Sequence, residues 1–106
     1  MKATYDRQAD AIYVYLAPDR GPVERTDVLT SDVIVACGAS GTGTASEIAL
    51  ALKSGKFVIL LNGSKESRAY FKKIGGRLVV EADSVANTIE LIRMLLAKLE
   101  RARRRQ

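Results

Sequence analysis

Short apolar runs alternate with polar, glycine-containing links along most of this 106-residue chain. Two runs near the amino terminus, 2–6 and 11–17, are rich in aromatic and β-branched residues, and the polar stretch between them predicts a β-hairpin. Three further runs, 32–37, 57–62 and 77–82, also predict strands. The run at 32–37 is nearly continuously apolar, which is typical of a strand buried on both faces of a parallel sheet.

The segments that follow the later runs show apolar residues at helical spacing, which predicts helices. One helix is predicted from near Thr44 to a glycine cap at Gly55, a second over 64–74, and a third from about Asp83 to the tail. The apolar flank of the first helix is expected to comprise Ile48, Leu50, Ala51 and Leu52. In the third helix six apolar residues recur at spacings of three and four: Val85, Ile89, Ile92, Leu95, Leu96 and Leu99.

Alternating strands and helices with links of a few residues force neighbouring strands to run parallel. The sequence therefore predicts an α/β fold: a half-size Rossmann-like parallel sheet with an N-terminal antiparallel β-hairpin and a long C-terminal helix. A chain of 106 residues is expected to form a single domain, with a hairpin module at 1–24 and the Rossmann-like half-domain at 25–106.

Composition excludes several classes of site and partner. With no histidine and one cysteine, Cys37, the chain can form no zinc site, no histidine-dependent triad and no internal disulfide, so no metal site is expected. Four arginines within 101–106 supply most of the net charge of +5, leaving +1 for the remainder. Arginines at a helix end suit its dipole, so nucleic acid is not an expected partner. No apolar run approaches the ~20 residues of a membrane span, and a cytoplasmic location is expected.

A glycine-rich loop, "GASGTGTASE" at 38–47, joins the strand at 32–37 to the first helix. Glycines there are expected to adopt positive φ and to leave the backbone open to a ligand. The unsatisfied N–H groups that begin the helix, with nearby hydroxyl groups, form a cradle suited to phosphate. No lysine completes a Walker A loop, which argues against an NTPase. The candidate binding residues are Gly38, Ser40, Gly41, Thr42, Gly43, Thr44 and Glu47.

A purely structural interpretation of this loop carries equal weight. Thr44 and Glu47 have the spacing of a capping box, in which the two side chains satisfy the helix's own N–H groups without any ligand. A carboxylate would also repel a phosphate, so a functional Glu47 is expected to face a ribose or another hydroxyl-bearing group.

The stretch "SDVIVACGASGTGTASEIALALKSGKFVILLN" resembles the family that includes the molybdenum cofactor carrier proteins and the lysine decarboxylase-like, cytokinin-activating phosphoribohydrolases. The loop of that family reads Gly-Gly-x-Gly-Thr-x-x-Glu. Residues 41–44 and Glu47 match this motif, whereas Ser40 replaces its first glycine. The resemblance covers roughly 30–97 and implies a Rossmann-like fold that binds a nucleotide or a phosphate-bearing pterin, usually in a homo-oligomer. Family members also carry an N-terminal half that this chain lacks.

The N-terminal hairpin resembles a different, small and uncharacterised bacterial family with the pattern Tyr-Asp-x-x-x-Asp-Ala-x-Tyr. Tyr5, Asp6, Asp10, Ala11 and Tyr13 carry this match, from which no function follows. Two resemblances that meet near residue 35 suggest a chimera, natural or engineered. The hairpin tyrosines are expected to form a cross-strand packing face rather than ligand contacts.

Three hypotheses about function remain open. The first is carrier-like binding of a phosphate-containing small molecule, with a molybdopterin-type cofactor or a nucleotide as the candidate ligand, and it is favoured over an enzyme. The second is a structural or partner-binding domain with no ligand, which includes the case of a recombined or designed chain. The third is a phosphoribohydrolase-like enzyme that uses Glu47. Exposed sheet edges in so short a chain also predict a homo-oligomer.

Overall fold

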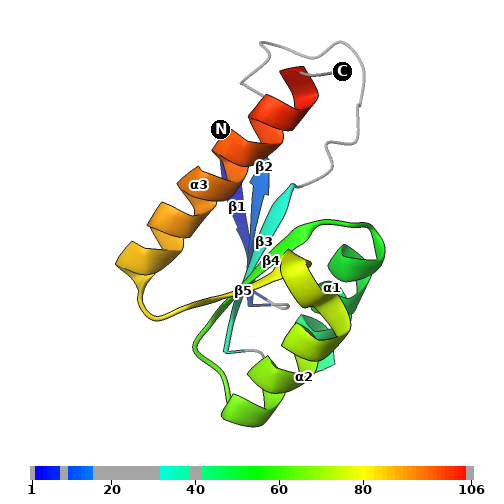
Figure 1. Cartoon of the computed structure of the whole chain (residues 1–106). Coiled ribbons are helices and arrows are strands. Elements are labelled where there is room, and N and C mark those ends of the chain that lie inside the picture. Colours follow the sequence, from blue (N-terminus) through cyan, green and yellow to red (C-terminus); the bar gives the residue numbers. More distant parts are fainter. Residues whose placement is uncertain (1, 8–9, 16–31, 39–41, 105–106) are drawn as a thin grey trace, which may run out of the picture.

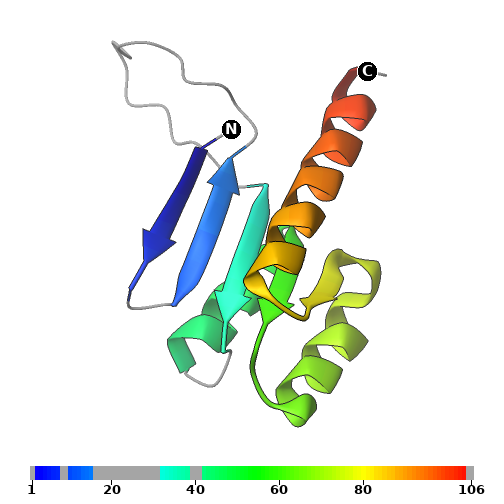
Figure 2. The same cartoon turned by 90° about the vertical axis from the view of Figure 1, so that its left-hand side faces the viewer.

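The computed structural model describes residues 2–7, 10–15, 32–38 and 42–104. Five strands form one mixed sheet, in which sequence order and spatial order agree (Figure 2). The strands are β1 (Lys2–Asp6), β2 (Ala11–Tyr15), β3 (Val33–Cys37), β4 (Phe57–Leu61) and β5 (Val79–Ala82).

Two kinds of strand pairing meet at β3. β1 and β2 pair antiparallel as a hairpin, and β2 pairs antiparallel with β3. β3, β4 and β5 then run parallel to one another. The predicted parallel sheet with an antiparallel hairpin on one edge is thus confirmed.

Helices cover both faces of the sheet, giving three layers (Figure 1). α1 (Thr42–Lys53) follows β3 and α2 (Lys65–Gly75) follows β4, and both lie on one face. α3 (Val85–Arg104) follows β5 and crosses the other face, where it contacts β3, β4 and β5.

Strand residues alternate between two apolar clusters, as a sheet buried on both faces requires. Beneath α1 and α2 lie Ala11, Ile34, Ala36, Ile48, Ala51, Val58, Leu60, Phe71 and Val79. Beneath α3 lie Val14, Val33, Val35, Ile59, Leu61, Ala82, Leu95 and Leu96. β2 supplies residues to both clusters, so the hairpin shares the core of the parallel strands.

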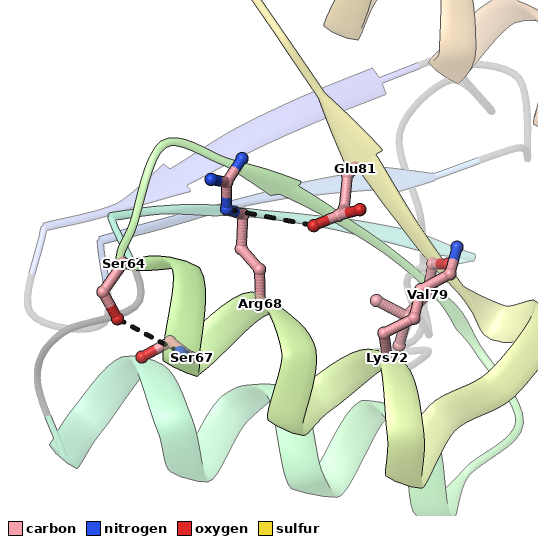
Figure 3. Close-up of polar contacts among 6 residues, drawn as sticks. All are labelled: Ser64, Ser67, Arg68, Lys72, Val79 and Glu81. Carbon is pink, nitrogen blue, oxygen red and sulfur yellow. Dashed lines mark hydrogen bonds and ion pairs between the residues drawn. The ribbon is translucent and has the colours of Figure 1, made fainter.

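Polar contacts cap the start of α2 and join this helix to the edge strand β5 (Figure 3). The Ser64 hydroxyl oxygen accepts a hydrogen bond from the Ser67 N–H at 3.1 Å and caps the helix start. Further along, the Lys72 ammonium donates to the Val79 carbonyl oxygen at 3.1 Å, and Arg68 Nε lies 3.8 Å from Glu81 Oε1. Gly76, with φ of +54°, ends the helix by donating its N–H to the Lys72 carbonyl.

Several sequence-based boundaries and core assignments need correction. The first helix begins at Thr42, two residues before the predicted start, and the last strand begins at Val79 because residues 76–78 form a 3₁₀ turn. The end of the predicted second strand, at 16–17, lies outside the described residues. Three residues assigned to apolar flanks are instead exposed: Leu50, Val85 and Ile89.

Candidate functional site

The carboxyl ends of β3, β4 and β5 lie at one edge of the sheet, where ligands bind in open α/β folds. α1 begins at this edge, directly after the glycine-rich loop. The turn of the β1–β2 hairpin reaches the same edge, because β2 runs antiparallel to β3 and places Ala11 opposite Ala36. The Cys37 N–H donates to the Asp10 carbonyl oxygen at 3.0 Å. The hairpin turn is therefore a neighbour of the loop.

Gly38 begins the loop in a backbone conformation that residues other than glycine rarely adopt. Its φ is +90°, and its N–H donates to the Leu61 carbonyl oxygen at 2.8 Å, which holds the end of β3 against β4. A Cβ atom at this position would lie 3.7 Å from Asp10 Oδ2, an ordinary contact. The requirement for glycine at this position therefore comes from the backbone angle rather than from crowding.

The remaining loop residues fall into two groups. Ser40 and Gly41 lie outside the described residues. Thr42 and Gly43 are the first two residues of α1, so the expectation that Gly43 adopts positive φ is wrong. Thr44 is buried within the first turn rather than placed at the cap, which removes the geometry of a Thr44–Glu47 capping box.

Glu47 instead pairs with the hairpin. The Tyr13 hydroxyl, from the middle of β2, donates to Glu47 Oε2 at 2.6 Å, and both residues are half-buried. Burial raises the pKa of Tyr13, and the hydrogen bond to Glu47 raises it further, because both favour the protonated hydroxyl. Sequence reasoning assigned Tyr13 to cross-strand packing and missed this contact, which joins residues 34 positions apart.

A second tyrosine–carboxylate pair lies within the hairpin itself. The Tyr5 hydroxyl donates to Asp10 Oδ1 at 2.6 Å, and this hydrogen bond raises the pKa of the exposed Tyr5. Asp10 has a φ of +50°, as is common for aspartate in tight turns. Its carboxylate also adds to the effect of burial in raising the pKa of the Cys37 thiol. Asp10 thus interacts with both the hairpin and the end of β3.

The other two helices that begin at this edge, α2 and α3, are capped by serine side chains that accept hydrogen bonds from N–H groups in the first turn. Ser64 caps α2, as described above. Before α3, the Ser84 hydroxyl oxygen accepts from the Asn87 N–H at 3.1 Å, while Asn87 Oδ1 accepts from the Asp83 N–H at 3.0 Å. This reciprocal pair acts as a capping box with asparagine in the position of glutamate.

The described residues at this edge include the acidic residues Asp6, Asp10, Glu47 and Asp83 and the basic residues Arg7 and Lys65. No group of three histidine, cysteine or acidic side chains among the described residues could hold a metal ion. Likewise, none of the helices in the described parts of the chain is long and apolar enough to cross a membrane.

The fold and the loop define a class of protein. It is a Rossmann-like α/β domain with a glycine-rich loop at the carboxyl edge of its sheet. The chain belongs to the SLOG cluster4 family, whose model matches residues 3–89. The matched range includes the hairpin and the parallel strands. No curated protein matches the sequence significantly.

Solved structures of the Moco carrier protein from Chlamydomonas reinhardtii are similar to this chain. One shows 46% sequence identity and a TM-score of 0.62, covering 64% of this chain and 41% of the carrier. Two others show 43% identity and a TM-score of 0.60, covering 63% of this chain and 42% of the carrier; one of them is described as a molybdenum cofactor carrier protein. The chain thus spans about two-fifths of the length of the carrier structures that it matches.

Proposed function

We propose that this protein binds a phosphate-bearing small molecule, of the molybdenum cofactor type or a nucleotide, and acts as a carrier in the cytoplasm rather than as an enzyme. The observation that carries the proposal is the 46% identity to a Moco carrier protein over 64% of the chain. The proposed binding residues are those of the loop and the first helix: Gly38, Ser40, Gly41, Thr42, Gly43, Thr44 and Glu47.

The geometry of the carboxyl edge supports a phosphate site at the start of α1. α1 follows the strand that ends at Cys37, and its first N–H groups lie at the positive end of the helix dipole. The serines that cap α2 and α3 use N–H groups of those helices, which makes their ends less suited to an anion. We place the phosphate at the start of α1 for this reason.

Charge separates the two parts of the proposed ligand. Glu47 lies in the second turn of α1, where its carboxylate accepts the hydrogen bond of the Tyr13 hydroxyl. A carboxylate repels phosphate but accepts hydrogen bonds from hydroxyl and amino groups. The phosphate therefore contacts the backbone N–H groups, and a donor-bearing ring or sugar contacts Glu47.

Titration calorimetry with inorganic phosphate, AMP and a pterin phosphate tests the proposal. Gly43→Val should abolish binding, because its side chain blocks the approach to the first N–H groups, while valine itself is tolerated in a helix. Ala49→Val is the matched control: it places the same side chain on an exposed position of α1 and should bind normally. Absence of binding to the unmodified protein would refute the proposal.

Glu47→Gln distinguishes a carrier from a hydrolase. The change removes the charge but keeps an oxygen that can accept the Tyr13 hydrogen bond. A carrier should bind phosphate as well as before or slightly more tightly, whereas a phosphoribohydrolase would release ribose phosphate from AMP and lose this activity in the variant. Release of adenine from AMP by the unmodified protein would contradict the carrier assignment.

We also propose that the protein is a homo-oligomer. Every residue of the edge strand β1 is exposed, and several large apolar side chains lie on the surface: Leu50, Tyr70, Ile74, Val85, Ile89 and Met94. Exposed strand edges and apolar surfaces are commonly covered by association. Sedimentation should show a dimer or larger species at tens of micromolar protein; a monomer at that concentration would exclude this proposal.

A further inference from the structure

The hairpin contributes a side chain to the candidate site through Tyr13. Its ring packs beside the apolar cluster beneath α1, together with Ala45 of that helix. Its hydroxyl reaches Glu47 Oε2 at 2.6 Å, the short distance expected of a hydroxyl bound to a carboxylate. The packed ring and the short hydrogen bond together hold the carboxylate in one place.

We infer that Tyr13 is a positioning residue that orients the Glu47 carboxylate toward a hydroxyl or amino donor of the ligand. This inference rests on the proposed function, to which it adds the hairpin as a part of the binding site. An ionised carboxylate offers about four lone-pair sites, so Glu47 can accept from Tyr13 and from a ligand donor at once. Fixing its orientation before binding reduces the entropy lost when the ligand arrives.

The protonation state of Tyr13 suits this role. Burial and the contact with Glu47 both raise the pKa of its hydroxyl above the ordinary value for tyrosine, which is already far above neutrality. The hydroxyl is therefore a hydrogen-bond donor throughout the neutral range, and Glu47 accepts from it. A ligand donor then meets an oriented carboxylate rather than a rotating one.

Tyr13→Phe tests the role because it removes one oxygen atom and retains the packed ring. Binding of AMP and of a pterin phosphate should weaken about tenfold, a common effect of losing a hydrogen bond to a charged group. Binding of inorganic phosphate, which has no ring or sugar to contact Glu47, should change less than about twofold on the same grounds. Tyr15→Phe is the matched control, since Tyr15 lies two residues along the same strand and further from the carboxyl edge.

Coupling to Glu47 provides a second measurement. If Tyr13 acts through Glu47, the double variant Tyr13→Phe/Glu47→Ala should bind AMP no more weakly than Glu47→Ala alone, because alanine leaves no oxygen for Tyr13 to orient. Alkaline titration of tyrosine absorbance should also show one tyrosine ionising at lower pH in Glu47→Ala, because that variant removes the carboxylate that helps to raise the Tyr13 pKa.

The outcomes separate the inference from the function on which it rests. Unchanged AMP binding in Tyr13→Phe, or an equal loss of phosphate and AMP binding, overturns the positioning role while leaving the ligand site intact. An unaltered tyrosine titration in Glu47→Ala overturns the contact itself, whatever the ligand. A wild-type protein that binds none of the three probes refutes the proposed function, and the positioning role with it.

Discussion

Gly75, the last residue of α2, leaves no room for a side chain, and replacing it with alanine provides a quantitative test of the packing. Alanine is the better helix former by about 1 kcal/mol, so Gly75→Ala would stabilise an isolated helix. In the folded protein a Cβ at Gly75 would lie 2.3 Å from Val79 Cγ2 and 2.8 Å from Leu52 Cδ2. The added methyl group therefore has two opposed effects on stability: it favours the helix and it clashes with Val79 and Leu52.

The clash should outweigh the gain in helix propensity. The distance to Val79 Cγ2 is about 1 Å shorter than ordinary van der Waals contact, and Val79 is a fully buried residue of β5 whose short side chain cannot turn away. Overpacking of this kind costs about 1–3 kcal/mol. Subtracting the propensity gain leaves a net loss of up to about 2 kcal/mol in the free energy of unfolding, measured by urea denaturation followed by circular dichroism.

A double-mutant cycle isolates the clash from other effects. Val79→Ala removes the Cγ2 atom and destabilises on its own through the cavity that it leaves. Combined with Gly75→Ala, it should destabilise by at least about 1 kcal/mol less than the sum of the two single changes. Gly55→Ala is a contrasting control, because nothing lies within 4 Å of its Cβ position and its φ of +76° alone opposes alanine. Strict additivity, or a more stable Gly75→Ala protein, would refute the packing argument.

Three further predictions follow from ionisation and from the shared core. Unfolded Tyr13 ionises near its ordinary pKa while the folded residue stays protonated, so wild-type stability should fall as pH rises above about 10; urea midpoints of Tyr13→Phe should fall less. Cys37 should react slowly with iodoacetamide at neutral pH, and faster in Asp10→Asn. Because β2 belongs to both apolar clusters, tyrosine fluorescence and far-ultraviolet circular dichroism should report one coincident unfolding transition; separate transitions would mean independent modules.

The sequence predicted the elements of this fold because local signals and tertiary burial agree along most of the chain. Apolar runs such as 57–61 form strands that are buried on both faces, and polar links with glycine form the connections. The hairpin was recognisable from the polar stretch between two short β-prone runs. Boundaries were less accurate: the structure begins β5 two residues later than the pattern indicated.

Periodicity was a weaker guide to which side chains are buried. Leu50 was assigned to the apolar flank of α1, but it lies about 200° around the helix from the fully buried Ile48 and is exposed. Val85 has the spacing of a core residue in α3, yet it stands in the first turn, directly after the chain leaves the edge strand β5. An apolar residue at helical spacing is buried only where another element lies opposite it.

Local sequence patterns could not predict the hydrogen-bond partner of Glu47. Thr44 and Glu47 have capping-box spacing, so a contact within one turn was one of two interpretations that the sequence left open. The observed partner, Tyr13, lies 34 residues away and becomes a neighbour only because β2 pairs with β3. The useful signal would have been the antiparallel pairing of the hairpin with the first parallel strand, which sets Tyr13 opposite Ile34 on the face that α1 covers.

The hairpin and the parallel strands are physically interdependent, whatever their origins. β2 continues the sheet beside β3, the Asp10 carbonyl accepts from the Cys37 N–H, and Tyr13 binds the carboxylate of α1. Removing the hairpin would expose the edge of β3 and leave Glu47 without its hydroxyl donor. A boundary near residue 24 can therefore divide the sequence by resemblance, but it does not divide the sheet, the two apolar clusters or the candidate site. The family match across 3–89 agrees with this continuity.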